Sequence, residues 1–137
     1  MLRFGTDLSG QDDVRRHDLP QRPLADGPLV FANACTTAAA GPYMTNLLEE
    51  SFFQRGCRAF LGTETKVPIA FASRFAAAFF HFFALRVPEP LAADKAMALA
   101  QLFLWCHYRN LGGILYSYVN QYELFMADDA ELQAMRA

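Results

Sequence analysis

Apolar residues occur along the chain in blocks whose lengths and spacings predict alternating strands and helices. Leu29–Ala34 is a short, almost continuous apolar run, which is typical of a strand buried on both faces of a sheet. Through Tyr43–Arg55 the apolar residues share one helical face, and Gly56 is placed to end that helix. Cys57–Thr63 predicts a second strand, which the polar residues after it bring to an end.

The second half of the chain predicts two long helices and a third strand. Phenylalanines recur about every four residues through Ile69–Arg86, which predicts a buried helix that prolines terminate. Leu91–Arg109 is a further helical stretch. Its apolar positions at i, i+3, i+4 and i+7 spacing are expected to be buried: Leu99, Leu102, Phe103 and Cys106. Ile114–Val119 is rich in β-forming residues and predicts the last strand.

The predicted order of elements is strand, helix, strand, two helices and strand, which favours an α/β fold with a parallel sheet and flanking helices. Residues 1–27 are polar and charged and are expected to form a loop, and residues 127–137 form a charged tail. Three strands are few for an α/β sheet. We therefore expect residues 28–126 to be the carboxyl part, about half, of a larger domain.

The composition excludes several classes of protein. The chain has 137 residues, the length of one domain, and its 53% hydrophobic and 19% charged residues exclude disorder. A formal charge of −2 and the lack of any Lys/Arg run argue against nucleic acid as a partner. The most membrane-like stretch, Ile69–Leu85, is interrupted by Arg74 and His81, so we expect a buried helix and no membrane partner.

The cysteines indicate a reducing compartment. Cys35, Cys57 and Cys106 have no metal-ligand spacing, and their odd number makes a disulfide framework unfavourable. Met1–Gly10 has no signal-peptide core, so a cytoplasmic protein without metal or cofactor is expected. Cys57 and Cys106 are interpreted as core residues.

Chemistry is expected at the carboxyl ends of the strands, where ligands collect in open parallel sheets. Three segments follow the predicted strands: Cys35–Thr37, Thr63–Lys66 and Asn120–Tyr122. Cys35 comes directly after a buried strand and opens a run of small residues, so its thiol could act as a nucleophile if a histidine held it as thiolate. The alternative is a small buried hydrophobic residue, as most free cysteines are.

Three segments, in order and with sensible spacing, resemble one family. They are PLVFANACTTAA (Pro28–Ala39), GCRAFLGTETKVP (Gly56–Pro68) and NLGGILYSYVNQYELFM (Asn110–Met126). They resemble the "LVxLNAC", "GARAVIGT" and "GLLYxLYGDPDL" strands of the CHAT domain, a caspase-like cysteine peptidase family related to separases. Each motif alone is weak, whereas three in sequence are fairly specific.

The resemblance implies a role for particular residues. Cys35 matches the peptidase nucleophile, and its backbone N–H would help to bind the oxyanion. Thr63 and Glu64 end the strand that borders the substrate pocket, where Glu64 would favour a basic side chain; the alternative is a solvated or turn-capping glutamate. The family's histidine, usually a His-Gly after an apolar run, has no counterpart upstream of Cys35 except His17, which no strand precedes.

The remaining histidines do not replace the missing base. His81 and His107 fall within predicted helices, His81 on a face with Arg74 and His107 beside Cys106, and both are interpreted as structural or solvent-facing. The resemblance therefore implies the carboxyl half of a CHAT-family cysteine peptidase that is inactive as this polypeptide.

Two other functions remain open: a degenerate, inactive CHAT-like interaction module, and a small α/β binding domain whose similarity is coincidental. The partners expected are a peptide or protein substrate, and either upstream helical-repeat regions or a second copy of the chain. Self-association would arise at an apolar edge of the strand Leu29–Ala34.

Overall fold

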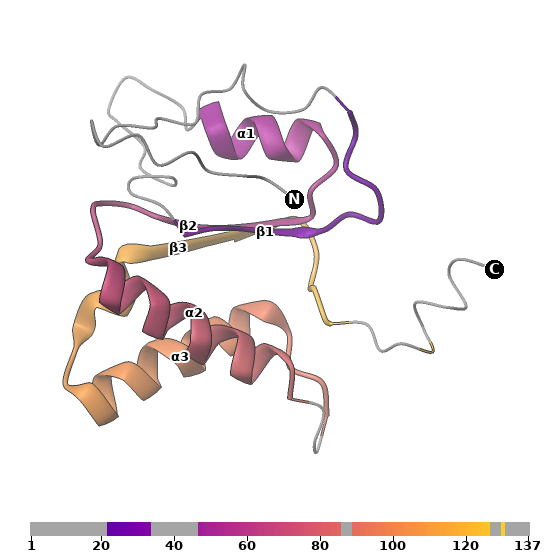
Figure 1. The fold of residues 1–137 in the computed structure, drawn as a ribbon. Coiled ribbons are helices and arrows are strands. Elements are labelled where there is room, and N and C mark those ends of the chain that lie inside the picture. The colour runs from indigo at the N-terminus through magenta and orange to yellow at the C-terminus, as the bar shows by residue number, and fades with distance from the viewer. Residues whose placement is uncertain (1–21, 34–46, 86–88, 127–129, 131–137) are drawn as a thin grey trace.

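A three-stranded sheet lies between one helix on one face and two helices on the other (Figure 1). The computed structural model describes residues 22–33, 47–85, 89–126 and 130. Most of the predicted N-terminal loop and charged tail falls outside these residues. The elements are, in chain order, β1 (Leu29–Ala32), α1 (Leu47–Gln54), β2 (Ala59–Thr63), α2 (Ile69–Phe83), α3 (Ala93–Tyr108), the 3-10 helix η2 (Leu111–Leu115) and β3 (Tyr116–Asn120).

The sheet is covered on both faces because its apolar residues alternate between two cores. Every residue of the central strand β2 is buried. Phe60 joins Cys57 in a cluster on the α1 side, whereas Leu61 joins the larger cluster of α2 and α3. Val30 and Phe31 of β1 divide between the two clusters in the same way. The α/β class and the doubly covered sheet expected from the sequence are confirmed.

The last strand runs in the opposite direction to the one predicted. β1 and β2 are parallel, but β3 pairs with β2 antiparallel, so the sheet is mixed. The reason lies in the two helices between these strands. The contacts of Arg74 with Tyr108 and of Phe82 with Phe103 show that α3 runs back alongside α2. One helix carries the chain across the sheet and the next returns it to the edge where β2 ends, so β3 must run back.

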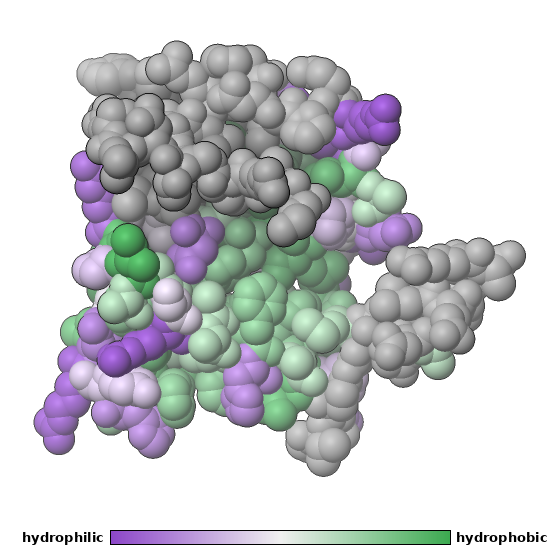
Figure 2. Space-filling model, viewed as in Figure 1, coloured by the Kyte–Doolittle hydropathy of each residue, from purple (hydrophilic) through white to green (hydrophobic). Residues whose placement is uncertain are grey.

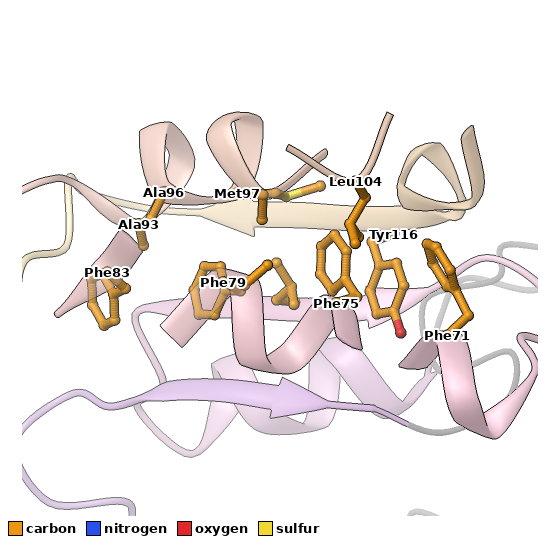
Figure 3. Close-up of a cluster of buried hydrophobic side chains, with 12 residues drawn as sticks. Phe71, Phe75, Phe79, Phe83, Ala93, Ala96, Met97, Leu104 and Tyr116 are labelled. Carbon is orange, nitrogen blue, oxygen red and sulfur yellow. The ribbon is translucent and has the colours of Figure 1, made fainter. Parts of the chain in front are cut away.

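α2 supplies most of the larger core. Phe71, Phe75, Phe79 and Phe83 are buried along one face of it, toward α3 and β3 (Figure 3). The predicted Phe-rich helix is therefore confirmed as a sheet-covering element. Neither α2 nor any other helix in the described part of the chain is long and apolar enough to cross a lipid bilayer.

α3 buries a different face from the one predicted. Leu99, Leu102 and Cys106 are exposed, and only Phe103 of the predicted set is partly buried. The buried face is made mainly of small residues: Ala93, Ala96, Met97, Ala100 and Leu104. The helix is apolar almost all round, so periodicity did not distinguish its two faces. Small side chains let α3 approach α2 and the sheet closely, which places the large residues outside.

β1 is one of the two edge strands of the described sheet. Its four residues are all apolar, yet each is only partly buried, unlike those of β2. Phe80 of α2, which is 43% exposed, lies 5.3 Å from Phe31 between ring centroids. Figure 2 shows hydrophobic surface across the middle of this view, over the sheet edge and α2. Self-association at this edge stays a prediction.

Candidate functional site

The carboxyl ends of β1 and β2 lie side by side and form one edge of the sheet. In the parallel pair Ala32 is opposite Gly62, and in the antiparallel pair Thr63 is opposite Tyr116. The N–H of Glu64 donates to the Leu115 carbonyl at 2.8 Å, which ties the end of β2 to the start of β3. Asn33 and Glu64, the first residues after the two parallel strands, therefore lie at this edge.

Asn33, the residue after β1, is held by two other elements. The Tyr116 hydroxyl donates to Asn33 Oδ1 at 2.7 Å, and Asn33 Nδ2 donates to the Ala72 carbonyl in α2 at 3.1 Å. The Tyr116 ring is stacked on Phe75 with 3.7 Å between centroids, and Figure 3 shows its hydroxyl pointing out of the apolar cluster. The chain therefore leaves β1 at a fixed point. Cys35 comes two residues later and lies outside the described residues, as does His17.

The two residues predicted to border a substrate pocket differ in accessibility. Thr63 is 1% exposed, whereas Glu64 is exposed. Of the two, Glu64 is the one that a substrate can reach directly.

The charge of Glu64 is felt on α1. The pKa of Glu49 is raised, first by burial and then by the charge of Glu64. Glu64 is therefore an exposed carboxylate at the end of β2.

The described histidines lie in the α2–α3 layer. His81 lines a groove between these helices together with Arg74, as their predicted common face requires. The His107 ring packs on Phe103, with 4.5 Å between centroids, and is exposed. The interpretation of both as structural or solvent-facing residues agrees with these positions.

The two described cysteines have opposite environments. Cys57 is 1% exposed, its Sγ donates to the Ala59 carbonyl at 3.4 Å, and burial raises its pKa to about 11. Its assignment to the core is confirmed. Cys106 is exposed on α3, so its assignment to the core was wrong, and His107 does not adjoin a buried thiol.

The segment Asn120–Tyr122 does not join the candidate site. Because β3 is antiparallel, Asn120 is opposite Ala59 at the start of β2, and Gln121 N–H donates to the Arg58 carbonyl at 3.0 Å. The segment therefore lies at the far edge of the sheet. Tyr116, at the other end of β3, reaches the candidate site instead.

Sequence reasoning missed Asn33 and Tyr116. Asn33 is the only polar residue in the run Leu29–Ala34, and that was the available signal. The sequence holds no comparable signal for Tyr116, because a tyrosine in a strand is usually a core residue. Its contact with Asn33 depends on the antiparallel direction of β3.

The fold is similar to part of a caspase-like protease. The chain matches no known protein family, and no curated protein is significantly similar to it in sequence. Among solved structures it is similar to separase in the crystal structure of the Saccharomyces cerevisiae separase–securin complex, with a TM-score of 0.52 and 20% identity. The similar region covers 66% of this chain and 6% of that chain. The likeness is one of fold, and it agrees with a small α/β domain that corresponds to part of the caspase-like fold.

Proposed function

We propose that this chain carries the nucleophile-bearing part of a caspase-like cysteine peptidase, with Cys35 as the nucleophile. The observation that supports the proposal is the parallel pairing of β1 and β2, which brings Asn33 and Glu64 to one edge of the sheet in a fold similar to part of separase. The CHAT-like motif around Cys35 adds the chemistry that the fold alone does not specify.

The position of Asn33 supports this role for Cys35. The covalent chain limits the distance between the Cα atoms of residues 33 and 35 to about 7.6 Å. Asn33 is fixed by Tyr116 and Ala72 at the carboxyl edge, where ligands collect in open α/β sheets. A fixed residue close in the chain suits a nucleophile, because small displacements of the attacking atom slow the reaction strongly.

The proposed reaction is acyl transfer. The Cys35 thiolate attacks the carbonyl carbon of the scissile peptide bond, the carbonyl oxygen takes the negative charge, and the amine leaves after protonation. The thioester is then hydrolysed, which restores the thiol. Both steps need a general base and acid, which His81 and His107 do not supply from the α2–α3 layer. A cysteine without a base is only a few per cent thiolate at pH 7, so we expect no measurable peptide hydrolysis by this polypeptide.

The proposed substrate carries a basic residue before the scissile bond. Glu64 is exposed at the carboxyl edge, and its charge acts on Glu49. A lysine or arginine side chain of the substrate would form a charge-assisted hydrogen bond with the exposed Glu64 carboxylate.

Covalent capture tests the proposal without requiring turnover. A peptide with arginine before a chloromethyl ketone, which alkylates a thiol that no base activates, should modify Cys35, as located by mass spectrometry of the digested protein, and Cys35→Ala should abolish the adduct. Citrulline in place of arginine should slow capture, and so should Glu64→Gln, whereas Glu50→Gln on the exposed side of α1 should leave it unchanged. Equal rates for arginine and citrulline would refute the basic preference, and absence of any adduct at Cys35 would refute the nucleophile.

A degenerate, interaction-only module is the second candidate. The observation in its favour is that His81 lines the α2–α3 groove and that the His107 ring packs on Phe103 in the same helical layer. In that case the peptide ketone should modify Cys35 no faster than a simple alkylating agent such as iodoacetamide does.

A further inference from the structure

A groove lies between α2 and α3 on the side of these helices away from the sheet. Its volume is about 550 Å³. The floor is made of the small residues Ala77 and Ala78 with Leu104, and aromatic walls are provided by Phe82 and Phe103. Arg74 closes one end, where its guanidinium carbon lies 5.0 Å from the centroid of the Tyr108 ring.

Two further large apolar side chains are exposed close in sequence to the lining residues. Leu85, which follows the C-cap of α2, is 37% exposed, and Leu99, one turn before Phe103 on α3, is 36% exposed. Exposed apolar side chains near a groove are typical of an interaction site.

The charge along this groove has one sign. α2 contains no acidic residue, and its ionisable side chains Arg74 and His81 both line the groove. The only acidic residue of α3 is Asp94 in its first turn, about 21 Å along the axis from Tyr108. Within the part of the chain that the structure describes, the Arg74 guanidinium contacts Tyr108 and forms no ion pair.

We propose that the α2–α3 groove binds an amphipathic helix of a partner protein, whose apolar face carries a carboxylate that pairs with Arg74. The stretch from Arg74 to Phe82 is about 12 Å long, which corresponds to slightly more than two helical turns. The alanine floor allows the backbone of such a helix to approach closely. Leucine-sized side chains of the partner would contact Phe82 and Phe103, as in helix-in-groove recognition.

A peptide helix fits this groove better than a small molecule does. Arg74, Ala77, His81 and Tyr108 are exposed, so the groove is open along its length. Small-molecule sites usually bury about 70–90% of the ligand, which this shape does not allow. The carboxyl edge of β1 and β2 is a separate site, so this proposal does not rest on the peptidase proposal.

The probe is a fluorescein-labelled, alanine-based helical peptide of about four turns, with leucines at i, i+3, i+4 and i+7 and one glutamate beyond them. A control peptide carries glutamine in place of that glutamate. Binding is measured by fluorescence anisotropy to the whole chain and to the variants Arg74→Met and Ala77→Glu. Ser73→Glu is the matched control, because Ser73 is exposed on α2 but does not line the groove.

Ala77→Glu should abolish binding by filling the floor and repelling the glutamate, and Ser73→Glu should bind as the unchanged protein does. Arg74→Met should lower the affinity for the glutamate peptide about fivefold and leave the affinity for the glutamine peptide unchanged, because only the glutamate peptide forms the ion pair with Arg74. Failure of the peptide to bind at millimolar concentration, or equal binding to Ala77→Glu, would overturn the proposal.

Two further outcomes would also overturn it by identifying another occupant. If the peptide binds only after residues 127–137 are removed, the acidic tail of the chain itself occupies the groove. If Ala77→Glu converts a dimer to a monomer in sedimentation analysis, a second copy of the chain does.

Discussion

Replacing Tyr116 by phenylalanine should destabilise the protein, whereas the same replacement at Tyr118 should not. The two tyrosines lie two residues apart on β3, and both side chains enter the cluster of α2 and α3. The Tyr116 hydroxyl donates to Asn33 Oδ1 at 2.7 Å. The Tyr118 hydroxyl is buried and forms no hydrogen bond within the described residues. The pair therefore isolates the value of the hydrogen bond that fixes the end of β1.

The expected difference follows from the partner that each hydroxyl has. Tyr116→Phe leaves the ring on Phe75 but leaves Asn33 Oδ1 without this donor, so the free energy of unfolding should fall by about 1–2 kcal/mol. The Tyr118 hydroxyl loses its hydrogen bonds to water on folding and forms none within the described residues. Tyr118→Phe should therefore raise the free energy of unfolding by up to about 1 kcal/mol.

Urea denaturation followed by far-ultraviolet circular dichroism measures both changes. The midpoint should move to lower urea for Tyr116→Phe and stay or rise for Tyr118→Phe, with the same slope in all three proteins. Equal destabilisation by the two replacements would refute the reasoning, because it would show that the hydroxyl of Tyr118 also contributes to stability.

The pH dependence gives an independent check on Tyr118. Burial, with a smaller effect from the charge of Asp94, raises its pKa from 10.0 to about 12. The folded state then holds a proton that the unfolded state loses, so stability should fall as the pH rises through this interval. Tyr118→Phe should lose less stability over the same interval than the unchanged protein, and an identical loss would contradict the assignment.

Three further changes test other parts of the structure. Glu49→Gln should stabilise the protein at pH 7 in urea titrations, because the raised pKa of Glu49 means that its charged form lowers the free energy of unfolding. This gain should vanish below about pH 4, where the carboxyl group is protonated in both the folded and the unfolded state, and Glu50→Gln should produce no such gain. Native alkylation followed by mass spectrometry should modify Cys106 rapidly and Cys57 only on unfolding. Arg109→Gly should raise the free energy of unfolding by about 1 kcal/mol in thermal denaturation. Arg109 ends α3 with a left-handed φ of 50°, which glycine adopts without the steric cost of a Cβ atom.

The sequence predicted the elements well because each follows from a local pattern. The run that forms β1 has no polar residue before Asn33, and the run that forms β2 is buried at every position, so both could be recognised as strands, although only β2 is central in the described sheet. The phenylalanine spacing placed α2 correctly, and the left-handed Gly56, with a φ of 94°, ends the turn after α1.

The direction of β3 and the buried face of α3 depend on tertiary packing, which local pattern does not report. The rule that alternating strands and helices give parallel sheets assumes one helix per crossover, and two helices lie between β2 and β3. In α3, Leu99 and Leu102 lie on a different face from Ala93, Ala96 and Ala100, and hydrophobicity favoured the leucines. The close approach of α2 selected the alanines instead.

The candidate site was predicted in part. Glu64 and the end of β1 could be placed from the order of the strands, since parallel neighbours end at the same edge. The hydrogen bond between Tyr116 and Asn33 could not be predicted, because it joins residues 83 positions apart through an antiparallel strand.

The most direct test of the account is the position of the Cys35 sulfur relative to the two edges of the sheet. A nitroxide attached to Cys35 in a Cys106→Ser background, where Cys57 is protected by burial, broadens nearby amide signals in nitrogen-15 spectra. The two ends of β2 are about 13 Å apart, enough for a clear gradient of broadening. The account predicts strong broadening at Glu64 and Leu115. Stronger broadening at Asn120 and Gln121, or a Cys35 that resists labelling as Cys57 does, would contradict it.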